Sequence, residues 1–77
     1  MTQEKVIAIL NEVKPTRDLS AIEDIIEGGY LDSFELMSLI SLLSESFNIE
    51  IGFEEIAPEN FNSVAAMVAM VEKLQNN

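Results

Sequence analysis

Apolar residues recur with the 3.6-residue period of an α-helix in three segments of the chain. In residues 2–14, one stripe consists of Val6, Ile9, Leu10 and Val13. Residues 33–47 carry the most regular stripe, which consists of Leu36, Leu39, Ile40, Leu43 and Phe47. After residue 63, a third stripe consists of Val64, Met67, Val68, Val71 and Leu74. The pattern therefore predicts three main helices.

The residues that flank these stripes are typical of helix ends. Pro15 has no backbone N–H to donate, so the first helix should end at residue 14. Asp32 and Glu35 have the spacing of a capping box at the start of the second helix, and Ser63 is a favourable N-cap for the last one. Pro58 precedes a predicted single turn over residues 59–61. The alternation over residues 49–52 is too short for a strand and predicts an extended connection.

The long connection over residues 15–32 is too apolar to be a solvated linker, so we expect it to pack on the core. Residues 20–23 (Ser-Ala-Ile-Glu) fit a capping box, which predicts a short helical piece near 21–27 that Gly28 ends in a left-handed conformation. The expected fold is all-α, a small antiparallel four-helix bundle. It has three main helices, a short third helix and a long packed loop between helices one and two.

Composition narrows the function classes. The 77 residues suit one domain, 1–77, and contain neither histidine nor cysteine. The usual general base, zinc ligands and thiol nucleophile are therefore missing, and we expect no enzyme and no metal site. A net charge of −10 opposes binding to nucleic acid or anionic lipid and favours basic partners. Without a long apolar run or a secretory leader, we expect a cytoplasmic protein with no membrane span, and a monomer.

The segment over residues 28–34 contains the candidate functional residue. Two glycines, Gly28 and Gly29, lead into the capped helix, and Ser33 lies in its first turn, where free N–H groups and the helix dipole favour an attached anion. The chain resembles the acyl carrier protein superfamily in its motif Leu31-Asp32-Ser33-Phe34, in the apolar helix after it and in the run that follows that helix. It looks especially like the D-alanyl carrier proteins and similar discrete carriers. The following run is Phe47-Asn48-Ile49-Glu50-Ile51.

The resemblance implies that Ser33 carries covalent phosphopantetheine, derived from coenzyme A, and that Asp32 is both motif residue and helix cap. The chain would be modified by a phosphopantetheinyl transferase. It would then carry a thioester-bound acyl or aminoacyl group from a loading ligase to a downstream acyltransferase or synthase. The missing cysteine fits this scheme, because the cofactor brings the thiol.

The motif helix also predicts a protein-binding face. Its outward positions mix apolar and polar residues, and the predicted contacts are Phe34, Glu35, Met37, Ser38 and Leu42. Ser38, Ser41 and Ser44 stand where fatty-acid carriers are richer in carboxylates, which argues against fatty-acid partners. A cleft beside the motif helix, as long-chain carriers use, could be lined by Ile51, Ile56, Phe61 and Val64, although ordinary core packing explains these residues equally well. If Phe61 fills that cleft, a short group held outside the bundle is favoured. The alternative is a noncatalytic acidic adaptor, in which Ser33 only caps the 33–47 helix and that helix binds a partner.

Overall fold

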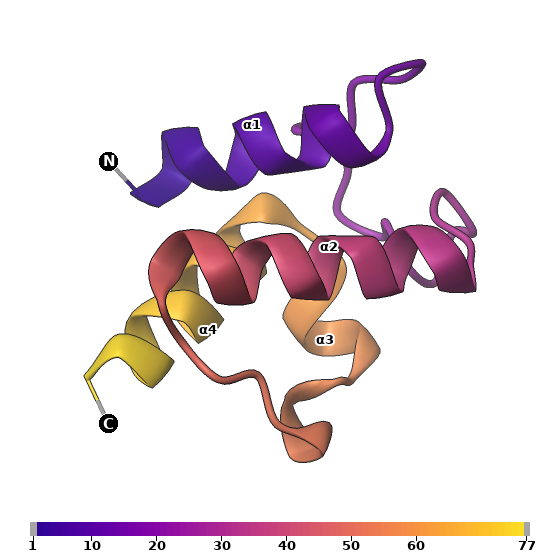
Figure 1. The fold of residues 1–77 in the computed structure, drawn as a ribbon. Helices are drawn as coiled ribbons and strands as arrows, with labels where there is room; N and C mark the ends of the chain where they lie inside the picture. The colour runs from indigo at the N-terminus through magenta and orange to yellow at the C-terminus, as the bar shows by residue number, and fades with distance from the viewer. Residues whose placement is uncertain (1, 77) are drawn as a thin grey trace.

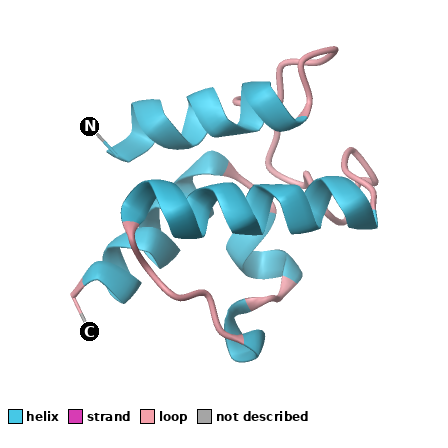
Figure 2. Ribbon diagram, in the orientation of Figure 1, coloured by secondary structure: helices cyan, strands magenta, loops and turns pink. Residues whose placement is uncertain are grey.

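The computed structural model describes residues 2–76, and within them every regular element is helical (Figures 1 and 2). The α-helices are α1 (Thr2–Val13), α2 (Ser33–Phe47), α3 (Pro58–Phe61) and α4 (Val64–Gln75), and a single 3₁₀ turn, η1, covers Phe53–Glu55. α1 packs against both α2 and α4, and α3 packs against α4. Figure 1 shows α1 and α2 running in opposite directions. The predicted small helical bundle with a long loop after its first helix is confirmed. No helix in residues 2–76 is long and apolar enough to cross a membrane.

A single apolar core joins all of these elements except η1. The three predicted stripes supply most of it, as expected from their period, and Phe61 of α3 adds the largest fully buried side chain. The loop contributes Leu19, Ile25 and Leu31, so the prediction that it packs on the core is confirmed. The buried residues of the helices are Val6, Ile9, Leu10, Leu39, Ile40, Leu43, Phe47, Phe61, Val64, Met67, Met70 and Val71.

The helix predicted near residues 21–27 is absent from the loop. Ser20 Oγ accepts no hydrogen bond from a described backbone N–H, and its own N–H and hydroxyl donate to the Asp18 carboxylate, at 3.0 and 2.7 Å. These two donors also hold the pKa of Asp18 below its ordinary value. A side chain that bonds to nearby backbone in this way competes with helix formation, and here the competitor lay two residues upstream.

Residues 24–30 instead form one closed turn. The Gly29 N–H donates to Ile26 O and the Tyr30 N–H to Ile25 O, which is the bond pattern of a Schellman motif. The left-handed residue is therefore Gly29, at φ +77°, and not Gly28. Gly28 is required for a different reason, since a Cβ there would lie 2.7 Å from Asp24 O.

Asn62, between α3 and α4, caps this turn from 36 residues away. Its Oδ1 accepts hydrogen bonds from the backbone N–H groups of Ile26 and Glu27, at 3.0 and 3.1 Å. Its backbone O accepts from the Ile25 N–H at 2.9 Å, and its Nδ2 donates to the Glu27 carboxylate. One asparagine thus fixes the middle of the long loop against the start of α4.

The observed ends of the main helices agree closely with the ends predicted from the sequence. α2 begins and ends at the predicted residues, α1 ends one residue early, and Ser63 Oγ accepts from the Ala66 N–H at the start of α4. Asn48 ends α2 in a left-handed conformation, at φ 53°. The 3₁₀ turn η1 was not predicted, because residues 53–55 lack the proline or cap that would mark it.

We expect Asn62→Ala to lower the free energy of unfolding by about 1–3 kcal/mol, because two loop N–H groups lose their acceptor. Urea denaturation followed by far-UV circular dichroism measures this. Asn11→Ala, at an exposed position of α1, is the matched control and should change stability by less than about 0.5 kcal/mol. Equal stability of the two variants would show that the Asn62 bonds do not hold the loop.

Candidate functional site

Ser33 is the first residue of α2 and is exposed to solvent. Asp32 caps the helix by accepting from the Glu35 N–H at 2.8 Å, and Glu35 Oε1 accepts from the Asp32 N–H at 2.9 Å. The predicted capping box is therefore present in full. The Ser33 hydroxyl has no hydrogen-bond partner within residues 2–76, so it is not the cap.

A part-buried ion pair holds the capping box in place. Lys14 Nζ, just past the end of α1, donates to both oxygens of the Glu35 carboxylate, at 3.0 and 3.3 Å. The two side chains are 29% and 25% exposed, so solvent screens the pair less than a surface pair. The bond ties the end of α1 to the start of α2. Since 21 residues separate Lys14 from Glu35, no local sequence pattern signals it.

The segment before Ser33 is also fixed. The Arg17 guanidinium lies over the Tyr30 ring, 4.7 Å from its centroid, which is a cation–π contact. The two glycines before Tyr30 are part of the Schellman turn, in which the Gly28 and Gly29 N–H groups donate to Asp24 O and Ile26 O. Space next to the turn is open all the same, since a Cβ on Gly29 would meet no other atom within 4 Å.

The outward face of α2 begins next to Ser33. Phe34 is 87% exposed and Met37 57% exposed, values that are high for such large apolar side chains. Together with Ser38, Ser41 and Leu42 they line an open hollow of about 430 Å³. A neighbouring hollow of about 290 Å³ reaches Glu12 and Val13 of α1.

Two of the predicted contact residues are placed differently from the prediction. Leu42 is half-buried and packs against the core, so it lines the floor of this face and is not a freely exposed side chain. Glu35 is half-buried, and its carboxylate already binds Lys14 and the helix cap. Both residues lie on the side of α2 near α1, since Glu35 binds Lys14 and Leu42 lines a hollow together with Val13.

A small apolar hollow of about 150 Å³ lies on another side of α2. Leu36, one turn after Ser33, forms its wall on α2, and Ile56 and Phe61 face it from the other elements. These two residues were expected in a cleft, but Ile51 and Val64 are not in its lining. Phe61 is 1% exposed, so the core buries almost all of this side chain where it lines the hollow.

Phe53, in η1, is 90% exposed, which the sequence did not predict. A lone phenylalanine in a connection has no periodic pattern that could reveal its exposure. Only the turn that carries it shows that it points outward.

Comparison with known proteins finds carrier proteins. The chain is 37% identical over 54 residues to the D-alanyl carrier proteins of Streptococcus pyogenes serotype M5 (strain Manfredo), serotype M49 (strain NZ131) and serotype M1. The matched segment covers 70% of this chain and 68% of each relative. No protein-family model matches the chain.

Proposed function

The chain belongs to the acyl carrier protein family, with D-alanyl carrier proteins among its relatives, and from this premise we propose that it is a discrete carrier modified with phosphopantetheine on Ser33. Residues 1–77 form one carrier domain in this proposal. The domain is a substrate of other enzymes and has no catalytic function of its own.

The observation that carries this proposal is the free hydroxyl at the first position of α2. Asp32 and Glu35 satisfy the helix start, so Ser33 Oγ is exposed and available for modification. Backbone N–H groups at a helix start and the partial positive charge there favour a phosphodiester. When attached, phosphopantetheine supplies a terminal thiol, a group that this cysteine-free chain lacks.

The fixed surroundings of Ser33 also support the proposal. The capping box, the Lys14–Glu35 ion pair and the Arg17–Tyr30 contact hold the backbone on both sides of the serine. A transferase that recognises a folded surface would therefore meet one defined conformation, with little ordering entropy lost on binding.

The proposed partners are a phosphopantetheinyl transferase, a loading ligase and a downstream acyltransferase or synthase. The face of α2 formed by Phe34, Met37 and Ser38, with Leu42 as its floor, is the surface that they would share. The exposed aromatic and thioether side chains can enter apolar pockets of a partner, and the face lies beside the modified serine.

The adaptor alternative keeps the same surface and assigns no chemistry to Ser33. In that alternative Ser33 served as the helix cap, but Asp32 holds the cap position. We therefore retain the carrier function as the proposal.

For cargo we propose a short aminoacyl or acyl group, and the names of the relatives point to D-alanyl. The hollow beside Leu36 measures about 150 Å³, a size that holds roughly one benzene-sized group. Phe61, which is 1% exposed, forms part of its lining. A longer chain would have to displace core side chains, which is costly in a close-packed interior.

The attachment site is tested by intact-mass spectrometry after incubation with coenzyme A, magnesium and a promiscuous phosphopantetheinyl transferase. The parent chain should gain one phosphopantetheine, and Ser33→Ala should gain none while keeping its helical circular dichroism signal. Ser46→Ala, an exposed serine of the same helix outside the docking face, is the matched control and should be modified like the parent. Modification of Ser33→Ala would overturn the assignment.

The docking face is tested with Phe34→Glu and Met37→Glu. Each change places a charge where an apolar contact is expected, so each should lower the rate of loading by the cognate ligase about tenfold or more. Phe53→Glu is the control, because Phe53 is equally exposed but lies outside this face. Loading at the parent rate in both α2 variants would place the docking surface elsewhere.

Cargo size is tested by thermal melting of the holo protein carrying non-hydrolysable alanyl or octanoyl analogues. If both groups stay outside the bundle, the two melting temperatures should agree within about 2 °C. A buried chain would add up to about 0.8 kcal/mol per methylene, and about 1 kcal/mol corresponds to 4–8 °C in a domain of this size. A rise of about 5 °C or more for octanoyl would contradict short cargo.

A further inference from the structure

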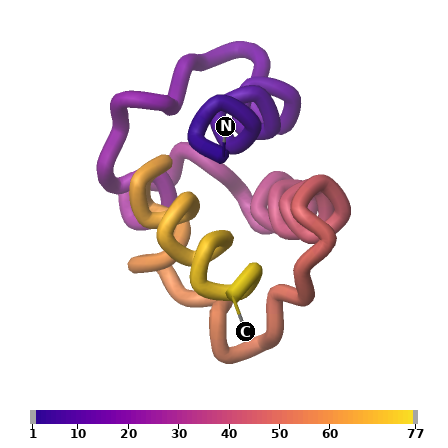
Figure 3. Tube along the Cα trace, turned by 90° about the vertical axis from the view of Figure 1, so that its left-hand side faces the viewer, coloured from indigo at the N-terminus to yellow at the C-terminus, as the bar shows by residue number. Residues whose placement is uncertain are grey.

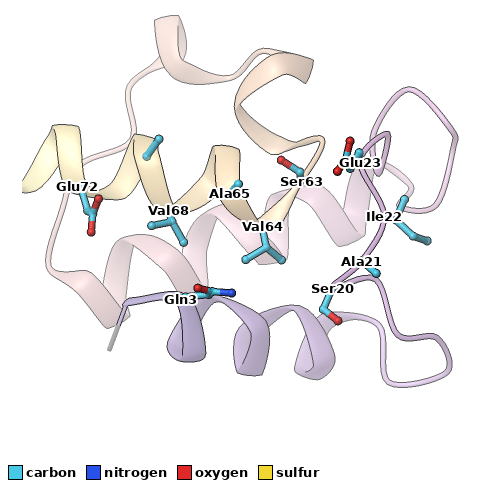
Figure 4. A pocket seen from close by; sticks show the side chains of 11 residues that line it. Gln3, Ser20, Ala21, Ile22, Glu23, Ser63, Val64, Ala65, Val68 and Glu72 are labelled. Carbon is cyan, nitrogen blue, oxygen red and sulfur yellow. The ribbon is translucent and has the colours of Figure 1, made fainter.

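A groove of about 470 Å³ lies between α1, the loop after Leu19 and α4 (Figure 4). Its apolar floor comes from the first turns of α4, and an adjoining hollow continues it toward the start of α1. The residues of the floor are Val64, Ala65, Val68 and Ala69.

The groove is separate from the Ser33 site. It shares no lining residue with the two hollows on the outward face of α2 or with the apolar hollow beside Leu36. Figure 3 shows α2 on the right, α4 and most of the loop to its left, and α1 above α2 and α4. A molecule in the groove would leave Ser33, Phe34 and Met37 accessible.

The ends of the groove are acidic. Glu23 from the loop and Glu72 from α4 lie at opposite ends of it in Figure 4. No basic residue is part of the lining. All four basic side chains of the chain bind elsewhere, Lys5 over Phe47, Lys14 at Glu35, Arg17 over Tyr30 and Lys73 at Glu55.

We propose that this groove is the docking site for a basic amphipathic helix of a partner protein. The apolar floor would accept the apolar face of such a helix, and the two carboxylates would pair with lysine or arginine side chains at its edges. Net charge on the carrier speeds the encounter with a basic segment. Nucleic acid, the other common occupant of a charged groove, is repelled by these carboxylates.

The dimensions of the groove fit a helix. Ser63, beside Glu23, and Glu72 are nine residues apart on α4, which corresponds to about 13 Å at 1.5 Å per residue. Two lysines seven residues apart on the docked helix are about 10 Å apart on one face, and their flexible side chains span the difference. The short side chains of Ala65 and Ala69 permit close approach of the helix axes.

Docking here would hold the carrier without covering its serine. One partner could then keep the protein close while a second enzyme works at Ser33 on α2. The proposal does not depend on modification of Ser33, so unmodified protein is sufficient to test it.

The probe is a fluorescein-labelled 16-residue helical peptide with a leucine and alanine stripe and two lysines seven residues apart. Fluorescence anisotropy measures its binding to the full chain. The carrier variant Glu23→Gln/Glu72→Gln should bind about fivefold more weakly than the parent, because two edge charges are removed. The matched double variant Glu45→Gln/Glu50→Gln removes the same charge at exposed positions outside the groove and should stay within about twofold of the parent.

Chemical-shift mapping by NMR locates the peptide. The largest amide shifts should fall in residues 21–23 and 64–72, and Ala69→Arg should abolish them. Ser33→Ala should bind the peptide like the parent, which separates this test from that of the carrier function. Absence of saturable binding, equal loss in the two double variants, or largest shifts at residues 34–42 would each overturn the proposal.

Discussion

The hydrogen bonds of Asn62 join the long loop between α1 and α2 to the start of α4, a connection that helix packing alone does not make. α1, α2 and α4 bury their apolar stripes against one another, but the nineteen residues between α1 and α2 form no regular helix or strand. Their backbone N–H groups need acceptors, and burial of Leu19, Ile25 and Leu31 requires that the loop stay on the core. Asn62 supplies acceptors for the N–H groups of residues 25–27. The Schellman turn then fixes the chain as far as Tyr30, shortly before α2 begins.

The position of Ser33 follows from that constraint. The turn before it ends at Tyr30, Leu31 is buried, and Asp32 begins the capping box. The Lys14–Glu35 ion pair adds a tie to α1 from the opposite side. The exposed serine hydroxyl therefore lies on a rigid support, although it takes no part in holding the structure together. That separation of roles is what the proposed modification requires.

Charge is distributed unevenly over the surface of the molecule. Each of the four cations is held by an aromatic ring or a carboxylate of the same chain, so the remaining carboxylates give the outside its negative potential. The outward face of α2 carries exposed apolar side chains and serines, and the groove at α4 carries carboxylates around an apolar floor. The two proposed binding surfaces thus differ in chemistry and lie on different sides of the molecule.

The motif at residues 31–34 indicated the family. The sequence by itself also determined the three main helices, because periodicity, proline and the Asp32–Glu35 spacing act within a few residues along the chain. It placed α2 at its observed bounds and identified Ser33 as the candidate residue. Tertiary structure decided the rest. Ser20 donates to Asp18 and does not form the predicted capping box, and the hydrogen bonds of Asn62 hold residues 24–30 as a single turn. Lys14 bound Glu35, and packing against α1 half-buried Leu42. Most of these contacts join residues 20 or more positions apart, and no local pattern encodes which distant partner a polar side chain will meet.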